Sequence, residues 1–297
     1  MWHPVLLARL GTFIFCFVFL GQVRAASPAQ YDQLVVFGDS LSDTGNTFAA
    51  AGLPQPPYYD GRWTNGPNWV DYFAPMAGLP TPTAYLRYRG TNFAVGGATS
   101  EYAAGEIATY VAVSGGYINP NNLYVLWIGA NDFRAGLTAQ QTLQFIQTEL
   151  VSLTLAGAKH IIVVNVPDIS LTPDVRAAGG ATIAAAKQFV TTVDVGLQNN
   201  LPYLGLVLGT NIALVDVNLL FNELVYNPAA FGFANSTGSA FNPNTGQVLP
   251  SPDLYVFWDG FHPTTYAHRL AAITILTGLT DAGGTNPFAG WLTTTGF

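Results

Sequence analysis

A serine near the start of the chain has a position suited to nucleophilic chemistry. Ser40 follows the apolar run 34–37, a glycine and an aspartate. An apolar, β-branched run that breaks at glycine predicts a strand that ends in a turn, which would expose the serine hydroxyl at the carboxyl edge of a sheet. Because a serine hydroxyl is a poor nucleophile until a base removes its proton, the chain must also supply a base.

Three of the four histidines are expected to have no catalytic role. His3 lies in a predicted targeting segment, and His160 directly precedes the apolar run 161–164. A strand over that run would place His160 at the edge away from the predicted site. His268 lies in a helical pattern, which predicts a surface or packing role.

The remaining histidine, His262, has the context of a general base. Asp259 lies three residues before it in a loop that contains a glycine, and a proline ends this loop. This spacing lets the carboxylate turn back and accept the proton of imidazole Nδ1, which leaves Nε2 free to take the serine proton.

Two further segments supply hydrogen-bond donors. Asn131 follows the strand-like run 123–128, which predicts an amide at the same sheet edge as Ser40. The paired glycines Gly96 and Gly97 allow close approach of the backbone and free an N–H for a ligand. A serine, a glycine N–H and an asparagine amide are the donors that an oxyanion hole needs, and one such donor contributes about 3 kcal/mol of transition-state stabilisation.

In this order, the segments resemble the GDSL family of SGNH hydrolases, specifically its branch of secreted lipases, esterases and hemolysins. The resemblance covers residues 34–276. Its glycine block favours Gly97 as the donor, and the adjacent Gly96 is the alternative. The resemblance implies a catalytic triad of Ser40, Asp259 and His262, and an oxyanion hole made of Ser40, Gly97 and Asn131.

The resemblance implies a serine esterase that hydrolyses carboxylic esters and uses no cofactor. Short-chain acyl esters are the expected substrates, since no large lid segment and no long exposed apolar helix is evident. A lipase or phospholipase and a carbohydrate acetylesterase are alternatives on the same scaffold. The expected partner is therefore a small-molecule ester or lipid.

Two other classes of function are compatible with parts of the sequence. An oxygen-rich metal site for phosphoester hydrolysis is one, but few histidines and no ligand pair at helical spacing argue for no metal. A carbohydrate-binding surface domain that presents aromatic side chains is the other, but the intact catalytic motifs argue against it. The candidate metal ligands are Asp39, Asp43, Asp132, Asp259 and His262.

The first residues have the pattern of a secretion signal. Arg9 precedes the apolar run 10–20, and the small residues at 23–26 offer a cleavage site. The single cysteine, Cys16, lies in this segment and lacks the small residues that precede a lipidated cysteine. We therefore expect a signal peptide at 1–26, secretion to an extracellular or periplasmic location, and no stable membrane anchor.

The rest of the chain, 27–297, is expected to be a single hydrolase domain, because its two ends must meet in one site. Apolar residues make up 49% of the chain, enough for a sizeable core. Charged residues make up only 9%, and the formal net charge is -7, which argues against nucleic acid as a partner.

The pattern of elements predicts an α/β fold. Strand-like runs alternate with segments long enough for helices, which is typical of a three-layer α/β/α sandwich around a mostly parallel, flavodoxin-like sheet of five strands. The predicted strands are 34–37, 85–93, 123–128, 161–166 and 212–217, and the predicted helices are 139–156, 175–198, 218–225 and 264–277.

Two long connections are expected to flank the site. They cover residues 51–61 and 227–252 and are rich in Gly, Pro and Asn. Related secreted enzymes often carry cysteines in the second connection, but 231–254 contains none, so packing alone is expected to hold it. Aromatic side chains in and after the first connection are expected either to line an acyl or sugar pocket or to belong to the core: Tyr58, Tyr59, Trp63 and Trp69.

Overall fold

The computed structural model describes residues 31–283, so the predicted signal segment 1–26 lies outside the described residues. Its centre is a four-stranded sheet in the order β1-β2-β3-β4, and every neighbouring pair is parallel. This confirms the predicted α/β class and the mostly parallel sheet. The strands are β1 (Leu34–Gly38), β2 (Leu123–Trp127), β3 (His160–Val164) and β4 (Asn211–Val215).

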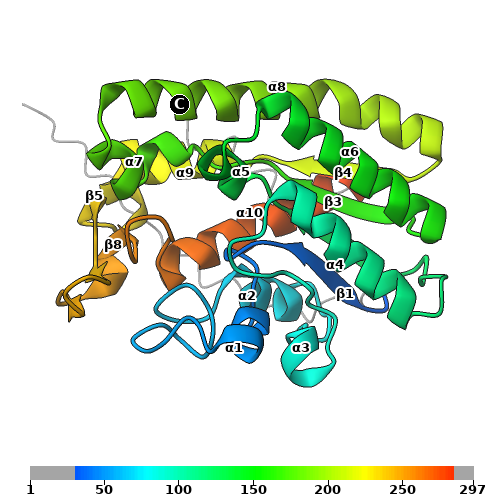
Figure 1. The fold of residues 1–297 in the computed structure, drawn as a ribbon, viewed down its shortest axis with the longest axis horizontal. Coiled ribbons are helices and arrows are strands. Elements are labelled where there is room, and N and C mark those ends of the chain that lie inside the picture. Colours follow the sequence, from blue (N-terminus) through cyan, green and yellow to red (C-terminus); the bar gives the residue numbers. More distant parts are fainter. Residues whose placement is uncertain (1–30, 284–297) are drawn as a thin grey trace, which may run out of the picture.

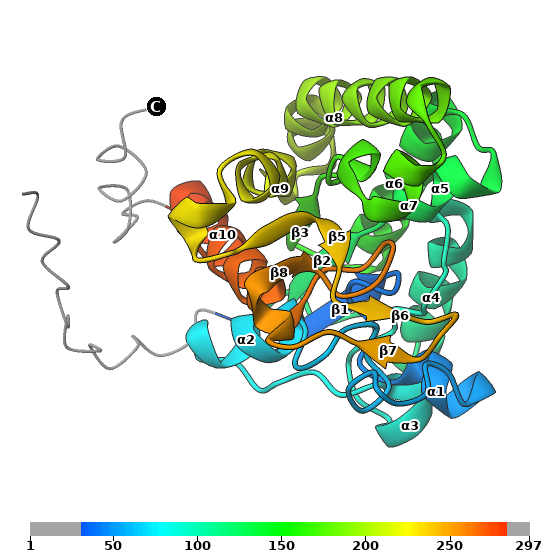
Figure 2. The ribbon, with the colours of Figure 1, turned by 90° about the vertical axis from the view of Figure 1, so that its left-hand side faces the viewer.

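Helices cover both faces of the sheet, as Figures 1 and 2 show. Alternate side chains along a strand point to opposite faces, so Val35 and Phe37 join one apolar cluster while Leu34 and Val36 join the other. The first face packs against α4 (Ser100–Val113), α6 (Ala139–Ala156) and α8 (Gly180–Leu208), and the second against α2 (Trp69–Met76), α9 (Val217–Tyr226) and α10 (Thr265–Gly283).

The predicted fifth strand at 85–93 is wrong. Its first residues form the short helix α3 (Tyr85–Tyr88), and only Asn92 makes a parallel bridge, to Val36 of β1. The side chain of Asn46 donates to the carbonyls of Asn92 and Ala94, each at 2.9 Å. Backbone hydrogen bonds still join residues 91–95 to β1, but the N–H of Gly38 donates to Oε2 of Glu106 instead of continuing this ladder, so the segment runs beside β1 without forming a regular strand.

Most predicted helices are confirmed, with one difference. The helix predicted over 139–156 is α6, and those predicted over 218–225 and 264–277 correspond to α9 and α10. The pattern over 175–198 is divided between α7 (Pro173–Ala177) and α8, which runs on to Leu208. Two short helices, α1 (Asn46–Ala51) and α5 (Ala130–Ala135), follow β1 and β2. Between residues 31 and 283, no helix is long and apolar enough to cross a membrane.

The second long connection is built from short strands and turns at one end of the molecule, in front of the sheet in Figure 2. Its β5 (Asn235–Ser239) pairs with β8 (Tyr255–Phe257), and β6 (Phe241–Asn242) pairs with β7 (Gln247–Val248). Backbone pairing therefore adds to the packing expected here. Two 3₁₀ helices lie at its two ends, at Pro228–Phe231 and Pro252–Leu254, and a third lies between β3 and α7, at Ile169–Leu171.

Candidate active site

The turn after β1 presents Ser40. The backbone N–H groups of Ser42 and Asp43 both donate to the carbonyl of Asp39 at 3.0 Å, which closes the turn. At Gly38, where β1 ends, a Cβ would lie 2.2 Å from the carbonyl oxygen of Trp127 on β2, so only glycine fits. The strand can therefore end against β2 and deliver the serine at the carboxyl edge of the sheet.

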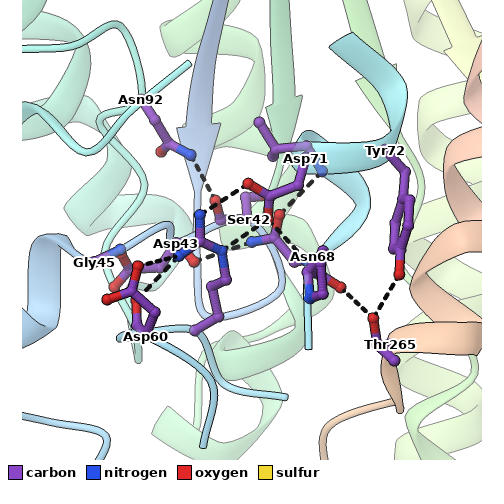
Figure 3. A network of polar contacts seen from close by, with 12 residues as sticks. Ser42, Asp43, Gly45, Asp60, Asn68, Asp71, Tyr72, Asn92 and Thr265 are labelled. Carbon is purple, nitrogen blue, oxygen red and sulfur yellow. Dashed lines mark hydrogen bonds and ion pairs between the residues drawn. The ribbon is translucent and has the colours of Figure 1, made fainter. Parts of the chain in front are cut away.

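A network of polar contacts around Ser42 and Asp43 holds this turn in place, as Figure 3 shows. Asn92 donates to the carbonyl of Ser42 at 2.7 Å, and Asn68 donates to the carbonyl of Asp43 at 3.0 Å. The Asp43 carboxylate accepts the N–H of Gly45 at 2.7 Å. Because these partners come from separate segments of the chain, the position of Ser40 depends on the packed fold and not on the turn alone.

The structure brings the predicted serine, histidine and aspartate together. Nε2 of His262 lies 2.9 Å from Oγ of Ser40, and Nδ1 lies 2.8 Å from Oδ2 of Asp259. All three side chains are buried. The result is one continuous line of hydrogen bonds from a carboxylate through an imidazole to a hydroxyl.

Asp259 is held firmly in this line. Its Oδ1 accepts the backbone N–H groups of Phe261 and His262, at 2.8 and 2.7 Å. Burial raises its pKa, but the charge of His262 and the hydrogen bonds from His262 and Tyr58 outweigh this and lower the pKa to about 2. The carboxylate is therefore ionised at neutral pH and can stabilise a positive charge on the imidazole.

The loop that carries Asp259 and His262 docks on α7. The N–H of Asp174 donates to the carbonyl of Gly260 at 2.9 Å. A Cβ on Gly260 would lie 1.9 Å from Oδ1 of the same aspartate, so a larger residue fits here only if the Asp174 carboxylate or the loop moves. The close approach sets where the loop lies on the rest of the fold.

The structure distinguishes the two glycines that the sequence left open. The N–H of Gly96 is occupied, because it donates to Oγ1 of Thr47 at 2.7 Å and to Asp43 at 3.0 Å. Gly97 is exposed, and its N–H donates to no residue within the described part of the chain. The geometry therefore favours Gly97 as the donor available to a ligand.

Asn131 lies at the start of α5, directly after β2, as its predicted position requires. Its Nδ2 donates to the carbonyl of Ala98 at 3.0 Å, so the amide is tied to the glycine turn and keeps a second N–H. The next residue, Asp132, is buried and accepts hydrogen bonds from the N–H and hydroxyl of Ser100 and from the hydroxyl of Thr142. Asp132 thus joins the starts of α4, α5 and α6 behind the amide.

Two aromatic residues, one in the first long connection and one just after it, contact the predicted triad. Sequence reasoning missed this role. The hydroxyl of Tyr58 donates to Oδ2 of Asp259 at 2.7 Å. The ring of Trp63 packs beside the imidazole of His262, with ring centroids 5.4 Å apart. Of the other aromatic candidates, Trp69 is buried in the core and Tyr59 is exposed.

His160 and His268 lie where their sequence context predicts, and His3 lies outside the described residues. His160 is the first residue of β3, and its ring contacts Tyr31. His268 is buried in α10, where burial, followed by the nearby charge of His262, lowers its pKa to about 3. A histidine that stays neutral in the core has a packing role.

The proposed metal ligands are engaged in other contacts. Within residues 31–283, no three His, Cys, Asp or Glu side chains are grouped to hold a metal ion. Asp39 accepts the N–H of Leu41 at 3.0 Å, and Asp43 and Asp132 each accept several hydrogen bonds from their surrounding turns. Their oxygens therefore serve to shape the turns.

The sequence of the chain is similar to those of known lipases and esterases. A family model described as GDSL-like lipase/acylhydrolase matches residues 34–275. Thermolabile hemolysin from Vibrio parahaemolyticus is 30% identical over 280 residues, which cover 85% of this chain and 65% of the hemolysin. Esterase EstA from Pseudomonas aeruginosa is 30% identical over 315 residues, which cover 85% of this chain but 47% of the esterase.

A solved member of the lipolytic G-D-S-L family from Veillonella parvula is 14% identical, with a TM-score of 0.45 over 82% of this chain and 96% of that chain. The chain thus spans 65% of the hemolysin and about half of EstA. The match to the family model extends over nearly all of the described sheet and helices, from β1 to α10. The chain belongs to the GDSL-like lipase/acylhydrolase family.

Proposed function

We propose that the chain is a serine carboxylic ester hydrolase in which Ser40 is the nucleophile. The observation that carries the proposal is the line of hydrogen bonds from Asp259 through His262 to Ser40, at 2.8 and 2.9 Å. An activated serine requires a base within hydrogen-bond reach and a third group that orients this base. Relatives named esterase and lipase support ester hydrolysis as the chemistry.

In the proposed reaction, Nε2 of His262 takes the hydroxyl proton while Oγ of Ser40 attacks the ester carbonyl. The imidazolium is stabilised by ionised Asp259 and then gives its proton to the leaving alcohol. Water follows the same route in reverse: His262 takes its proton, the hydroxide attacks the acyl carbon, and Ser40 leaves with the returned proton.

The negative charge on the carbonyl oxygen needs donors that are already in place. We assign this task to the N–H groups of Ser40 and Gly97 and to the amide of Asn131. Neither N–H has a hydrogen-bond acceptor among the described residues, and Asn131 keeps a free N–H. Donors held in position before the reaction cost no reorganisation when the charge develops.

A small apolar hollow beside the site supports short acyl groups as substrates. Leu41, Ala130 and Phe261, each next to a proposed site residue, line it together with Ile169 and Leu171. The free volume in the hollow is about 20 Å³, roughly the room that one water needs. Even a short acyl group therefore requires the lining to move, and each further carbon requires more movement, which favours short chains.

Labelling tests the nucleophile. A fluorophosphonate ester should modify the protein at Ser40 and stop ester hydrolysis with one-to-one stoichiometry. The Ser40→Ala variant should take up no label and lose turnover, whereas Ser42→Ala, a change in the same turn, should still be labelled. Full turnover by folded Ser40→Ala would sink the proposal.

The acyl preference follows from the hollow. Leu171→Ala enlarges it and should shift the kcat/KM optimum of a series of 4-nitrophenyl esters toward longer acyl chains. Leu224→Ala is the matched control, because Leu224 is buried in the same apolar cluster but does not line the hollow. Equal chain-length profiles for the two variants would place the acyl group elsewhere.

The wild-type profile separates the alternative functions. An optimum at long acyl chains would favour the lipase or phospholipase alternative. A preference for acetylated sugars would favour the acetylesterase alternative.

We also propose that the enzyme is exported, with 1–26 removed and 27–297 forming one hydrolase domain. The support is the signal pattern in the sequence together with a site that joins both ends of the described chain. Sequencing the amino terminus of the exported protein tests this, and a mature chain that still begins at Met1 would contradict it.

A further inference from the structure

One oxygen of Asp259 receives two side-chain donors. Oδ2 accepts Nδ1–H of His262 at 2.8 Å and the hydroxyl of Tyr58 at 2.7 Å. The second contact spans 201 residues of sequence, from the first long connection to the loop before α10. A buried carboxylate that already has backbone donors on its other oxygen does not need the phenol to hold its orientation.

We propose that Tyr58 is a positioning residue that acts on His262 through Asp259 and sets the pH at which the base becomes active. The proposal rests on the proposed function, since it requires His262 to be the base. Tyr58 would act by drawing charge from the carboxylate oxygen that faces the imidazole, and not by touching the substrate.

The phenol is fixed in place by aromatic neighbours from three segments. Its ring lies 5.8 Å from Trp63, 5.4 Å from Phe241 and 6.1 Å from Trp258, measured between ring centroids and in edge-to-face geometry. Edge-to-face contacts of this kind hold a ring at a defined angle. The hydroxyl therefore aims at Asp259 without the freedom of a surface tyrosine.

The phenol also stays protonated. Burial and the neighbouring charges of Asp259 and Asp174 raise the pKa of Tyr58 above its usual value. Among the described residues, the other titratable groups that interact with His262 are Asp39 and His268, and neither is changed in the variants below. Asp259 remains ionised, because its pKa is about 2. The contact is thus a donor on a carboxylate at every pH at which the enzyme works, and charge-assisted bonds of this type are the strong ones.

The sign of the effect follows from charge. A carboxylate stabilises the imidazolium form of its histidine partner, which favours the protonated and inactive base. A donor on the same oxygen weakens that stabilisation. Removing the hydroxyl should therefore move the acid limb of kcat/KM to higher pH, and strengthening the donor should move it to lower pH.

The test uses two changes at one position in the purified mature protein. Tyr58→Phe keeps the ring and deletes the hydroxyl, and should raise the midpoint of the acid limb by about half a pH unit or more. Incorporation of 3-fluorotyrosine at position 58 gives a more acidic phenol of nearly the same shape, and should lower the midpoint. Tyr59→Phe is the matched control, because Tyr59 is 46% exposed and should leave the limb unchanged.

The outcomes separate the proposal from the function that it rests on. If Tyr58→Phe lowers kcat at all pH values but leaves the midpoint unchanged, Tyr58 only packs, and the inference is wrong. If Ser40→Ala or His262→Ala keeps normal turnover and the same acid limb of kcat/KM, the proposed function itself fails. A thermal melt of each variant shows that the fold is intact before the profiles are compared.

Discussion

At the residue scale, the site depends on how completely its acceptors are occupied. Asp259 accepts two backbone N–H groups on Oδ1 and two side-chain donors on Oδ2. The donors proposed for the oxyanion show the opposite pattern, since Ser40 and Gly97 have N–H groups with no acceptor among the described residues. A site that stabilises negative charge on its substrate needs free hydrogen-bond donors, and its own acceptors should already be occupied.

The free amide of Asn131 leads to a kinetic prediction. Asn131→Ala should lower kcat by about 10²- to 10³-fold and leave KM for a short ester nearly unchanged, because the amide meets charge only in the transition state. Asn131→Asp should be at least as damaging, since a carboxylate repels the oxyanion. Steady-state kinetics with 4-nitrophenyl acetate provide the measurement. A raised KM at constant kcat would mean that Asn131 binds the ground state, and the three-donor hole would have to be abandoned.

At the element scale, the loop between β8 and α10 is positioned by its contact with α7. Gly260→Ala should push the loop away from Asp174, because the added Cβ would meet its carboxylate. Turnover should fall strongly as His262 moves from Ser40, since small misplacements of catalytic groups are costly.

A second change tests this cause. Asp174→Ala removes the obstructing carboxylate but keeps the backbone N–H that bonds to Gly260. Turnover of the double variant Gly260→Ala/Asp174→Ala should therefore exceed that of Gly260→Ala alone. Equal turnover in the two variants would show that steric contact with Asp174 is not the reason.

The elements that the sequence predicts well have a clear local apolar pattern. The core strands follow short continuous apolar runs, as expected for a parallel sheet covered on both faces, and α6 has apolar residues at a spacing of about 3.6. The structure has them within a few residues of the predicted bounds. The segment 85–93 has strand-like residues as well, but its first residues form α3, where the N–H of Leu86 donates to the side chain of Asn46, 40 residues away. Such a tertiary contact overrides local preference and leaves no local signal.

The site residues also differ in how well the sequence predicts them. Ser40, Asp259 and His262 were predicted to meet because each follows or precedes a recognisable element at a fixed spacing, and the structure brings them together. Tyr58 lies in a Pro-rich connection with no periodicity. Its contact with Asp259 depends on the packing of Phe241 and Trp258, so it emerges only from the folded chain.

At the scale of the whole molecule, several carboxyl groups are buried and form no ion pair with another described residue. Burial raises the pKa of Asp39 and of Asp194 to about 7, and it raises the pKa of Glu106 and Glu149 well above the usual value. Neither oxygen of Glu149 has a hydrogen-bond partner among the described residues. The folded protein therefore binds more protons than the unfolded chain near neutral pH.

This proton excess predicts how stability depends on pH. Stability is greatest where these groups are protonated in both states, and it is lost as the pH rises from the unfolded pKa values, near 4, toward the raised folded values. His268 acts in the opposite direction, because its pKa of about 3 in the fold costs stability as the pH falls below about 6.5. The cleanest window is therefore about pH 6.5 to 8, where the melting temperature should fall as the pH rises.

Calorimetry of two variants tests the assignment. Glu149→Gln removes one buried titrating group and should reduce the fall in melting temperature across this window. Glu101→Gln changes an exposed carboxylate on α4 and should leave the slope as it is in the wild type. Identical slopes in both variants and the wild type would show that Glu149 does not take part.

The distance along the chain between the serine and its base has a consequence for biosynthesis. Ser40 and His262 are 222 residues apart in sequence. While the chain is being translated, the hydroxyl is present long before the imidazole that would activate it. Under the proposed mechanism, a nascent or prematurely terminated chain that ends before His262 should be inert toward esters. Hydrolytic activity should appear only after nearly the whole described domain has been made and folded.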